Sequence, residues 1–439
     1  MYFAMLKPFS FFALINIIDL LLNNVTGVKW MHEKQHWVVI LIVLCFGQFL
    51  VFCGMTMIVP FLPLYIQELG IHDPVLQTRW AGLIFGINFL STMIMQPIWG
   101  AIADRYGRKM MLVRSSLGMA VMIVCTGFAT SVWHLFILRF LNGTISGFQP
   151  AATGYLSANT PKDKMGFALG ILQAGGISGL LIGPLVGGWL AGMIGFRAIF
   201  LVTGVAMFIA AICCILFIKE KNEKNTHIQK PVFTIWDGYR SILQNKQLNT
   251  LFFATFIIQF ILLSSTPLLP LYVQSIVPTP ERVAFFAGLV SALTGLANMI
   301  SSPILGKLSD RIGSIPVMTG CMLIASIFLT THAFAKTITF LLISRFLLGL
   351  CIGGITPAIQ SLIRKLTPQE KISRTFGLNS SALSLGNFAG PILAGFSASY
   401  IGIAPIFIIQ AILMFISGII VPYLLRKHAT VIEHRSNGN

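Results

Sequence analysis

Charged side chains are scarce in this sequence. Only 10% of its 439 residues are charged, whereas 56% are hydrophobic and the mean hydropathy is +0.84. A water-soluble fold of this length could not bury so large an apolar fraction. The composition therefore excludes an ordinary soluble protein and predicts an all-α membrane protein.

Patterns that would indicate catalysis or nucleotide binding are also missing. The 13 Asp and Glu residues all fall outside the long apolar segments, the seven cysteines form no CxxC or Cys/His pattern, and no GxxxxGKS or GxxxxGKT sequence occurs. An enzyme within the membrane needs acid, base, nucleophile or metal-binding groups in its spans, and an ATP-driven pump needs a phosphate-binding loop. We therefore expect no enzymatic activity, no metal and no cofactor.

Twelve apolar segments are separated by charged or Pro- and Gly-rich breaks. About 20 residues of helix cross a hydrocarbon core, and lipid offers no partner to an unpaired backbone amide, so each segment is expected to be a helical span. The predicted spans cover residues 37–59, 80–99, 110–129, 132–156, 167–191, 196–218, 249–275, 283–305, 315–335, 338–362, 376–399 and 403–425.

Basic residues are divided unequally between the two sides of these spans. Of the 30 Lys and Arg, 24 are counted on one side, including Arg114 near the start of the third span, and four on the other, while Arg139 and Arg345 lie deep within spans. Because short cytoplasmic loops retain Lys and Arg, both ends of the twelve-span core are expected to be cytoplasmic. The placement of the basic residues in short loops argues against nucleic-acid binding and makes the lipid bilayer the expected environment.

Residues 1–36 form a separate N-terminal extension. Residues 9–22 are apolar but short for a span, and they include Asn16 and Asp19. This segment could be a thirteenth span or an interfacial helix, or translation could begin at Met31. No small-residue cleavage site follows Leu22, which argues against a signal peptide.

The two halves of the chain repeat one another. At an offset of 206 residues, five residues of one motif recur: Pro97, Gly100, Asp104, Arg105 and Gly107 correspond to Pro303, Gly306, Asp310, Arg311 and Gly313. Residues 139, 143 and 147 correspond to residues 345, 349 and 353 by the same shift. At 207, Gly179, Gly183, Pro184 and Gly188 correspond to Gly386, Gly390, Pro391 and Gly395. The repeat predicts two pseudo-symmetric six-helix bundles, 37–218 and 249–425, joined by a cytoplasmic linker at 219–248 and followed by a tail at 426–439.

Three motifs resemble those of a known family. The run from Gly100 to Lys109 resembles the loop between spans 2 and 3 of the major facilitator superfamily, and Arg139 with its two following glycines resembles the span 4 motif. The span 5 residues are similar to the motif of drug:proton antiporters, and the whole of 33–427 resembles MdtG-type multidrug exporters. These span 5 residues are Gly179, Gly183, Pro184, Gly187 and Gly188.

The resemblance implies that the first motif is a cytoplasmic gate. Its members are Gly100, Asp104, Arg105, Gly107, Arg108 and Lys109, with Gly306, Asp310, Arg311 and Gly313 as the second copy. Its glycines permit a tight turn, and an aspartate there can meet a basic side chain or a helix N-terminus, near Thr375 in the outward-open state. The second copy has Ser314 and Ile315 in place of the Arg-Lys pair, so a weaker latch is expected.

The resemblance also implies a hinge at the span 5 motif and at Gly390 and Pro391 of span 11. Glycine permits close helix approach, and proline removes an amide donor and can bend a helix. Ordinary packing of small residues in a membrane would produce the same pattern, so both interpretations stay open.

Arg139 and Arg345 are the charges placed deepest in the predicted spans. A charge at that depth is expensive, so it normally faces a bundle interior or an aqueous cavity. No acid lies in the spans, and span 1 has Gln48 where many drug:proton antiporters carry a carboxylate. We therefore expect a neutral to positive cavity that favours neutral or anionic amphipathic substrates. Alternatively, Arg139 only hydrogen-bonds Gln48 or backbone carbonyls.

Other polar residues of the spans are further candidates for the cavity wall. These are Gln48, Asn88, Asn142, Gln173 and Gln259. Hydrogen bonding between helices would explain each of them equally well.

Together these features predict a monomeric secondary transporter of the inner membrane that exports small amphipathic compounds in exchange for protons. Alternating access is expected because the two repeated halves can rock about a central cavity, which suits transport better than a fixed channel. The alternative is uptake or exchange of a small organic anion bound by Arg139 and Arg345.

Overall fold

The described residues are entirely helical wherever they form regular structure. A computed structural model describes residues 36–106, 108–161, 164–218, 242–368 and 372–436. The predicted N-terminal extension up to residue 35, Gly107 and most of the predicted linker lie outside the described residues. Within the described ranges there is no strand, which confirms the predicted all-α fold class.

The first half contains seven described helices, three of them short, with 7, 14 and 12 residues in α3, α6 and α7. They are α2 (His36–Met57), α3 (Leu62–Glu68), α4 (Pro74–Tyr106), α5 (Arg108–Gly127), α6 (Val132–Ile145), α7 (Phe148–Asn159) and α8 (Met165–Phe217). Helix α8 covers two predicted spans, because the backbone turns sharply at Gly195 (φ 76°, ψ 163°) and helical structure resumes at once.

The second half has the same order with one difference. Its helices are α10 (Lys246–Ser264), α11 (Leu269–Ile276), α12 (Pro280–Ile312), α13 (Ser314–Ala333), α14 (Ile338–Leu366), α15 (Ile372–Ile401) and α16 (Ile403–Ser436). Gly402 (φ 83°) makes the turn between α15 and α16, 207 residues after Gly195. The difference lies in span 4: α14 is continuous, whereas its counterpart is broken into α6 and α7.

Helices cover all twelve predicted spans, but not all are equally apolar. Eight helices in the described part of the chain are long and apolar enough to cross a membrane by length and composition, and α8 is one of them. Helices α6 and α7, with 14 and 12 residues, are too short to meet this criterion singly, and α4 and α15 are not among the eight. Side chains of α4, α7 and α15 line the cavity described below, so these helices need polar groups that lipid-facing helices do not.

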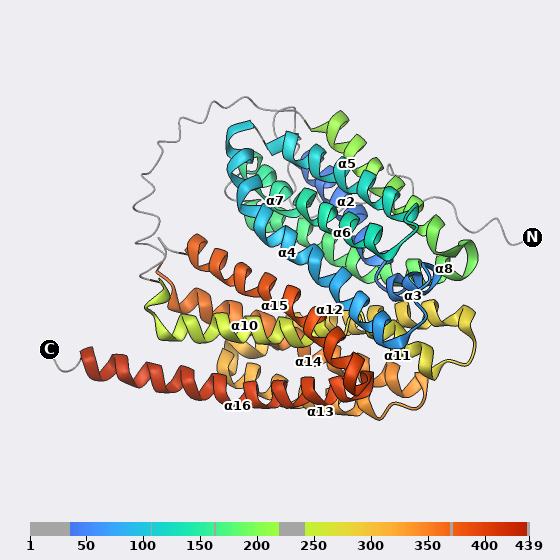
Figure 1. The fold of residues 1–439 in the computed structure, drawn as a ribbon. Helices are drawn as coiled ribbons and strands as arrows, with labels where there is room; N and C mark the ends of the chain where they lie inside the picture. Colours follow the sequence, from blue (N-terminus) through green and yellow to red (C-terminus); the bar gives the residue numbers. More distant parts are fainter. Residues whose placement is uncertain (1–35, 107, 162–163, 219–241, 369–371, 437–439) are drawn as a thin grey trace, which may run out of the picture.

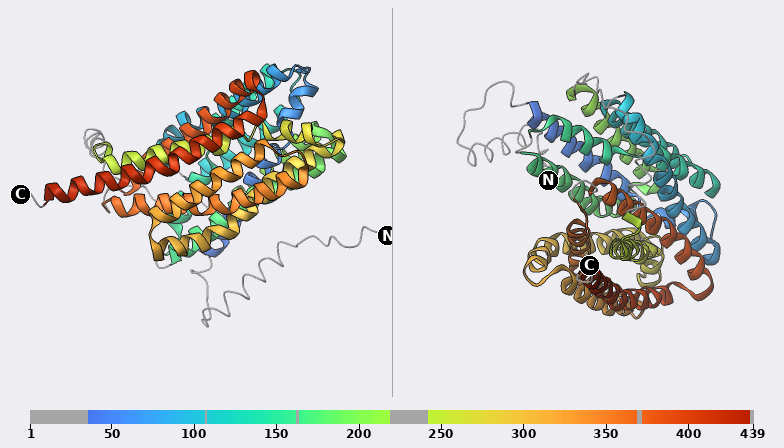
Figure 2. Two further views of the ribbon diagram at one scale, coloured as in Figure 1. Left: turned by 90° about the horizontal axis from the view of Figure 1, so that it is seen from below. Right: turned by 90° about the vertical axis from the view of Figure 1, so that its left-hand side faces the viewer.

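The two halves are separate bundles that meet at one end. They lie close together around α3 and α11 and diverge toward the end where α4 finishes and α15 begins (Figure 1). An end-on view shows the two bundles side by side (Figure 2). We call the end with α3 and α11 the closed end and the opposite end the open end. This arrangement agrees with the predicted pair of pseudo-symmetric bundles.

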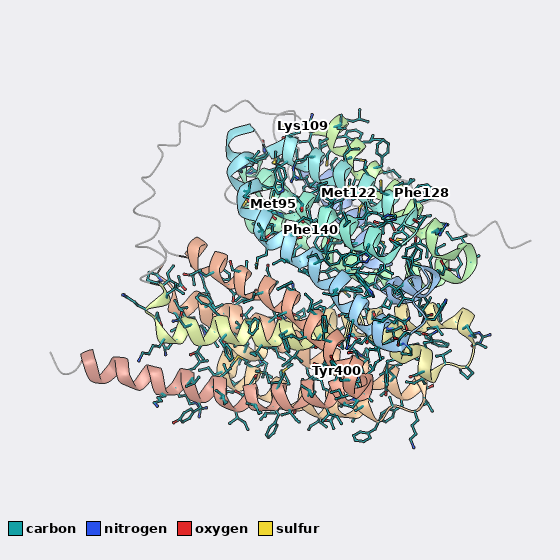
Figure 3. The ribbon with its side chains drawn as sticks, viewed as in Figure 1. Met95, Lys109, Met122, Phe128, Phe140 and Tyr400 are labelled. Carbon is teal, nitrogen blue, oxygen red and sulfur yellow. The ribbon has the colours of Figure 1, made fainter. Side chains whose placement is uncertain are left out.

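The outer surface of both bundles is strongly apolar. Phe128 and Tyr400 are 69% and 77% exposed and are among the side chains drawn in Figure 3. A soluble monomer rarely exposes large contiguous apolar patches, but such a surface suits contact with lipid tails.

Matching tyrosines reinforce each half near the closed end. The Tyr65 hydroxyl lies within hydrogen-bond distance of the carbonyls of Thr126 and Ala129, at 3.4 and 3.3 Å. The Tyr272 hydroxyl, 207 residues later, donates to the carbonyls of His332 and Ala335 at 2.7 and 3.2 Å. In each half the short helix after span 1 is thus tied to the end of span 3.

Candidate substrate cavity and gate

At the closed end, α4 and α15 pack together backbone to backbone. A Cβ atom on Gly395 would lie 2.5 Å from the Thr78 carbonyl oxygen and 3.0 Å from Cα of Gly82, and one on Gly82 would meet the Pro391 carbonyl. Only glycine permits helices from different halves to approach so closely.

Helices α8 and α12 repeat this contact on the opposite side of the pseudo-symmetry axis. A Cβ atom on Gly288 would meet the Pro184 carbonyl, and one on Gly188 would meet the Ala284 carbonyl. Gly82 and Gly288 are 206 residues apart, and Gly188 and Gly395 are 207 apart. Two symmetry-related glycine seams therefore hold the halves together.

Few polar contacts supplement these seams. The Gln67 amide donates to the Gln274 side-chain oxygen at 2.9 Å. Arg79 donates from Nε to the Ser399 hydroxyl at 3.0 Å, and its Cζ lies 5.0 Å from the centre of the Tyr400 ring. Exposed hydrogen bonds of this kind contribute little net free energy each, so the closed end can open without breaking an expensive contact.

Toward the open end, the space between the halves contains a cavity of about 470 Å³. It is lined by α4, α5, the start of α7 and α15. Its polar lining residues are Gln96, Trp99, Arg108, Arg114, Ser380, Ser381 and Ser384. A cavity that is open at one end and sealed at the other is the arrangement that alternating access requires.

Arg114 lies where α6 and α7 are interrupted. The backbone of Gly147 has φ 134°, and the Ile145 carbonyl at the end of α6 accepts a hydrogen bond from Nη1 of Arg114 at 2.9 Å. The Arg114 guanidinium also lies over the Trp99 ring, with Cζ 3.5 Å from its centre. Counting basic residues along the sequence had assigned Arg114 to the basic side of the membrane, whereas the structure places it in α5 on the cavity wall.

Arg139 lies in α6 and is partly buried. Its Nε is buried and has no hydrogen-bond partner among the described residues. The alternative bond to Gln48 is not formed: the Gln48 side-chain oxygen is also buried without a partner, and this residue packs against Gly176. The cavity lining described above does not include Arg139.

Arg345 occupies the corresponding position in α14, with a second buried base beside it. Nε and Nη2 of Arg345 lack partners in the described structure, and Cζ lies 5.8 Å from the centre of the Phe407 ring. His332 is fully buried, both of its ring nitrogens are unpartnered, and its ring lies 5.6 Å from that of Phe407. His332 was not among the residues predicted from the sequence for the site, although it is a lone histidine within an apolar span.

The predicted polar candidates are divided among different places. Asn142 donates to the side chain of Asn88 at 3.2 Å, and both are buried between α4 and α6. Gln173 accepts from Gln149 at 3.5 Å near the surface of the first half. Gln259 lines a small void of about 30 Å³ in the second half. None of these predicted residues belongs to the lining of the larger cavity.

Comparison with known proteins identifies the family. The family model for the Major Facilitator Superfamily matches residues 44–279 and 282–438. The chain belongs to the major facilitator superfamily. It is therefore a membrane transporter and not an enzyme.

Relatives and solved structures of the superfamily agree with this assignment. A multidrug resistance protein MdtG from Rahnella sp. (strain Y9602) is 38% identical over 387 residues, covering 87% of this chain and 92% of the relative. MdtG from Salmonella paratyphi C (strain RKS4594) is 37% identical over 388 residues, with 88% and 95% covered.

Among solved structures, a bacterial homologue of the human lysosomal transporter Spinster, in an inward-facing and unoccupied conformation, has a TM-score of 0.74. It is 15% identical, and the match covers 91% of this chain and 99% of that one. The nucleoside transporter NupG also has a TM-score of 0.74 at 13% identity, with 88% and 98% covered. At these identities the likeness concerns the fold.

The superfamily gate motif is only partly described. The side chains of Asp104 and Arg105, the burial of Gly100, and all of Gly107 lie outside what the structure describes. Arg108 donates to the Gly154 carbonyl, and Lys109 donates from Nζ to the Ile215 carbonyl at 3.1 Å, near the end of α8. In the second copy, the turn occurs at Gly313 (φ 98°), and no atom lies within 4 Å of a Cβ placed on Gly306.

The antiporter motif of span 5 faces two neighbours. Cβ atoms on Gly179, Gly183 and Gly187 would meet the α2 backbone, and one on Gly390 would meet α10. Gly188 and the carbonyls of Pro184 and Pro391 instead face the other half. Most of the motif thus lies at a contact within one bundle, and one side of it forms the seam between bundles.

Proposed function

We propose that this transporter exports small amphipathic compounds in exchange for protons, as a monomer in the inner membrane. The observation that carries the proposal is the cavity between the halves, open at one end and closed at the other by glycine seams. Rocking of the two halves about these seams would expose the cavity alternately to the two sides. The relatives named as multidrug resistance proteins support export of such compounds.

The orientation follows from the distribution of basic residues. The proposed cytoplasmic side carries 24 of the 30 Lys and Arg, including the ends of the twelve-span core and the linker between the halves. The cavity opens at that end, so we infer that the structure represents the inward-open state. In this state the gate motif would not be engaged.

Reconstitution into proteoliposomes tests the proposal. A panel of neutral, anionic and cationic amphipathic compounds is loaded under an imposed pH gradient, and their flux is followed with and without an uncoupler. Export in exchange for protons predicts flux that depends on the gradient and collapses with the uncoupler. Flux that is independent of the pH gradient would contradict proton-coupled export.

Uptake or exchange of a small organic anion is the second candidate. The two arginines in the cavity lining and the absence of an acid among its described lining residues favour this candidate. A strain lacking the protein would then fail to grow on the anion, whereas loss of an exporter would make cells accumulate the compound.

A further inference from the structure

The cavity between the halves has an unbalanced positive charge. Arg108 and Arg114 both line it, and none of its described lining residues is acidic. Two guanidinium groups remain charged under all physiological conditions. A partly enclosed site with two cations and no acid among its described lining residues attracts an anion from the surrounding solution.

Both arginines keep most of their hydrogen-bond donors available. Arg114 donates to the Ile145 carbonyl and Arg108 to the Gly154 carbonyl, which uses one N–H of the five on each guanidinium. The contact of Arg114 with Trp99 occupies one face of the guanidinium, and its Nε is buried without a hydrogen-bond partner among the described residues. The edge of a guanidinium is the part that binds oxyanions in a bidentate manner.

Helix α7 begins beside the same cavity and lies along it, with Gly147, Pro150, Ala151 and Gly154 of one helical face in the lining. Its N-cap, Gly147, provides no side-chain cap, and Gly147 and Pro150 line the cavity. The first backbone N–H groups of a helix lack partners within the helix and carry partial positive charge, which favours a bound anion. Pro150 has no N–H, so the neutral donors that this break adds beside the two cations are the backbone amides of Phe148 and Gln149.

The opposite wall offers hydroxyl groups. Ser380, Ser381 and Ser384 of α15 line the cavity, and Ser380 and Ser384 form no hydrogen bond to another described residue. Because residues three and four apart lie on one helical face, Ser380, Ser381 and Ser384 can all face the cavity from the other half of the protein. A ligand bound between them and Arg114 would contact both halves.

The scaffold itself does not require this charge. The residue 206 positions after Arg114 is Gly320, and the residue corresponding to Trp99 is Leu305. In the second half, α14 runs without a break through the region corresponding to Gly147. The second half thus forms the same bundle without the arginine, the tryptophan or the broken helix, so these features belong to a site and not to the fold.

We propose that this cavity binds an oxyanion group, a phosphate, sulfate or carboxylate, between Arg114, the N-terminus of α7 and the serines of α15, with Arg108 as a second cation. The inference rests on the proposed function and deepens it, since it names the acid group through which an amphipathic molecule is held. The group could be part of a transported compound or of an anionic phospholipid.

Binding by the purified full-length protein in phosphatidylcholine nanodiscs tests the site. Isothermal titration uses three probes with one ring system: 1-naphthyl phosphate, 1-naphthol and 1-naphthylmethylamine. We expect the phosphate to bind about 10- to 100-fold more tightly than the other two, as charge-assisted hydrogen bonds predict. The affinity for the phosphate should fall with added salt.

The variants separate a ligand role from a structural one. Arg114→Gln should lose most of the preference for the phosphate and Arg114→Lys should keep part of it, because lysine retains the charge but not the planar donor edge. Arg364→Gln is the matched control, since Arg364 is an exposed cation at the end of α14 outside the cavity. If Arg114→Gln does not fold, the binding of 1-naphthyl phosphate is compared in Arg114→Lys and Ser384→Ala instead.

Further measurements show whether the bound acid group comes from a lipid or from a soluble compound. They also show which of the two proposals a negative result contradicts. If phosphatidylglycerol stays bound to the protein in native mass spectra and competes with 1-naphthyl phosphate, the site binds a lipid headgroup. If phosphatidylglycerol does not compete, the site binds soluble compounds. Equal affinity for all three probes, or unchanged phosphate binding in Arg114→Gln and Ser384→Ala, overturns the oxyanion site. That result would leave proton-driven export of neutral compounds intact, whereas phosphate binding without any flux would contradict the proposed function alone.

Discussion

The guanidinium of Arg139 lies in α6, and its Nε has no hydrogen-bond partner among the described residues. Burying a charged group without a hydrogen-bond or ion-pair partner destabilises a protein. A charged residue at such a position is therefore a candidate for a functional role. It lies three residues before Asn142 in α6, and Asn142 donates to Asn88 of α4, one of the helices that line the cavity.

Replacing Arg139 should therefore reduce transport without lowering the stability of the protein. We expect Arg139→Leu to leave the apparent unfolding temperature unchanged or higher, because a desolvated charge is removed, while transport is lost. Arg139→Lys should keep part of the transport. Arg282→Gln, which removes an exposed cation at the start of α12, is the control and should transport normally. Full transport by both Arg139 variants would show that this arginine has no functional role.

Arg114 shows why single residues are hard to place from the sequence. It lies close to the basic loop after span 2, and a count of Lys and Arg assigns it to that loop. In the structure it is the seventh residue of α5, and its partners are Trp99 and the Ile145 carbonyl. Both partners come from other helices, and only the packing of α4, α5 and α6 brings them together.

At the scale of elements, the break between α6 and α7 is the main departure from the internal repeat. The broken helix ends at Ile145, where Ser146 bonds the Gly143 carbonyl at 2.8 Å and lies 3.1 Å from the Thr92 hydroxyl. Gly147 then takes a backbone conformation that side chains with a Cβ rarely adopt. The side chains of Ser146, Thr92 and Arg114 therefore replace the helical hydrogen bonds that the break removes.

Gly147→Ala tests whether the protein needs this break. A Cβ at φ 134° costs about 1 to 3 kcal/mol unless the backbone rearranges. We expect a lower apparent unfolding temperature and reduced transport. Gly320→Ala is the matched control, because Gly320 lies within α13 with no atom near its Cβ position, and alanine there should stabilise the helix. A variant as stable and active as the wild type would mean that span 4 can be continuous.

The glycine seams define a second element-scale prediction. A leucine at Gly395 must displace the Thr78 carbonyl and Gly82, so Gly395→Leu should separate α4 from α15 at the closed end. In a cysteine-free background we expect faster thiol labelling of a cysteine at Ser399 and a loss of transport. Gly170→Leu, at an uncrowded position in α8, should change neither measurement. Unchanged labelling in Gly395→Leu would contradict the role of the seam as the closure.

At the scale of the whole molecule, one hydrophobic core of the described residues is shared between the halves. The larger hydrophobic core belongs mainly to the first half but also includes Leu269, Val273, Ala287 and Val290 of the second half. The second core lies entirely within the second half. The molecule is thus two bundles hinged at one end, which allows each half to move nearly as a rigid body.

The proposed orientation predicts which cysteine replacements react from each side of the membrane. A cysteine at Gln244, just before α10, should be labelled by a membrane-impermeant thiol reagent only in inverted vesicles. A cysteine at Lys336, between α13 and α14, should be labelled only in intact cells. The reverse pattern would place the cavity opening on the outside and would turn the inferred inward-open state into an outward-open one.

The sequence by itself determined the membrane environment, the helical class, the twelve spans and the duplication. These properties depend on local apolar length, on the requirement that backbone groups pair within lipid, and on a repeat at 206 to 207 residues. The motifs from Gly100 to Lys109 and from Gly179 to Gly188 indicated the superfamily.

The tertiary structure decided which residues meet. Gly82 and Gly395 lie 313 positions apart, and Arg114 and Ser384 lie 270 apart, so no local pattern could pair them. The cavity lies between two bundles, and its wall depends on how they tilt relative to one another. For that reason the polar residues predicted for the cavity were placed elsewhere, and Arg114, Trp99 and the serines of α15 line it instead.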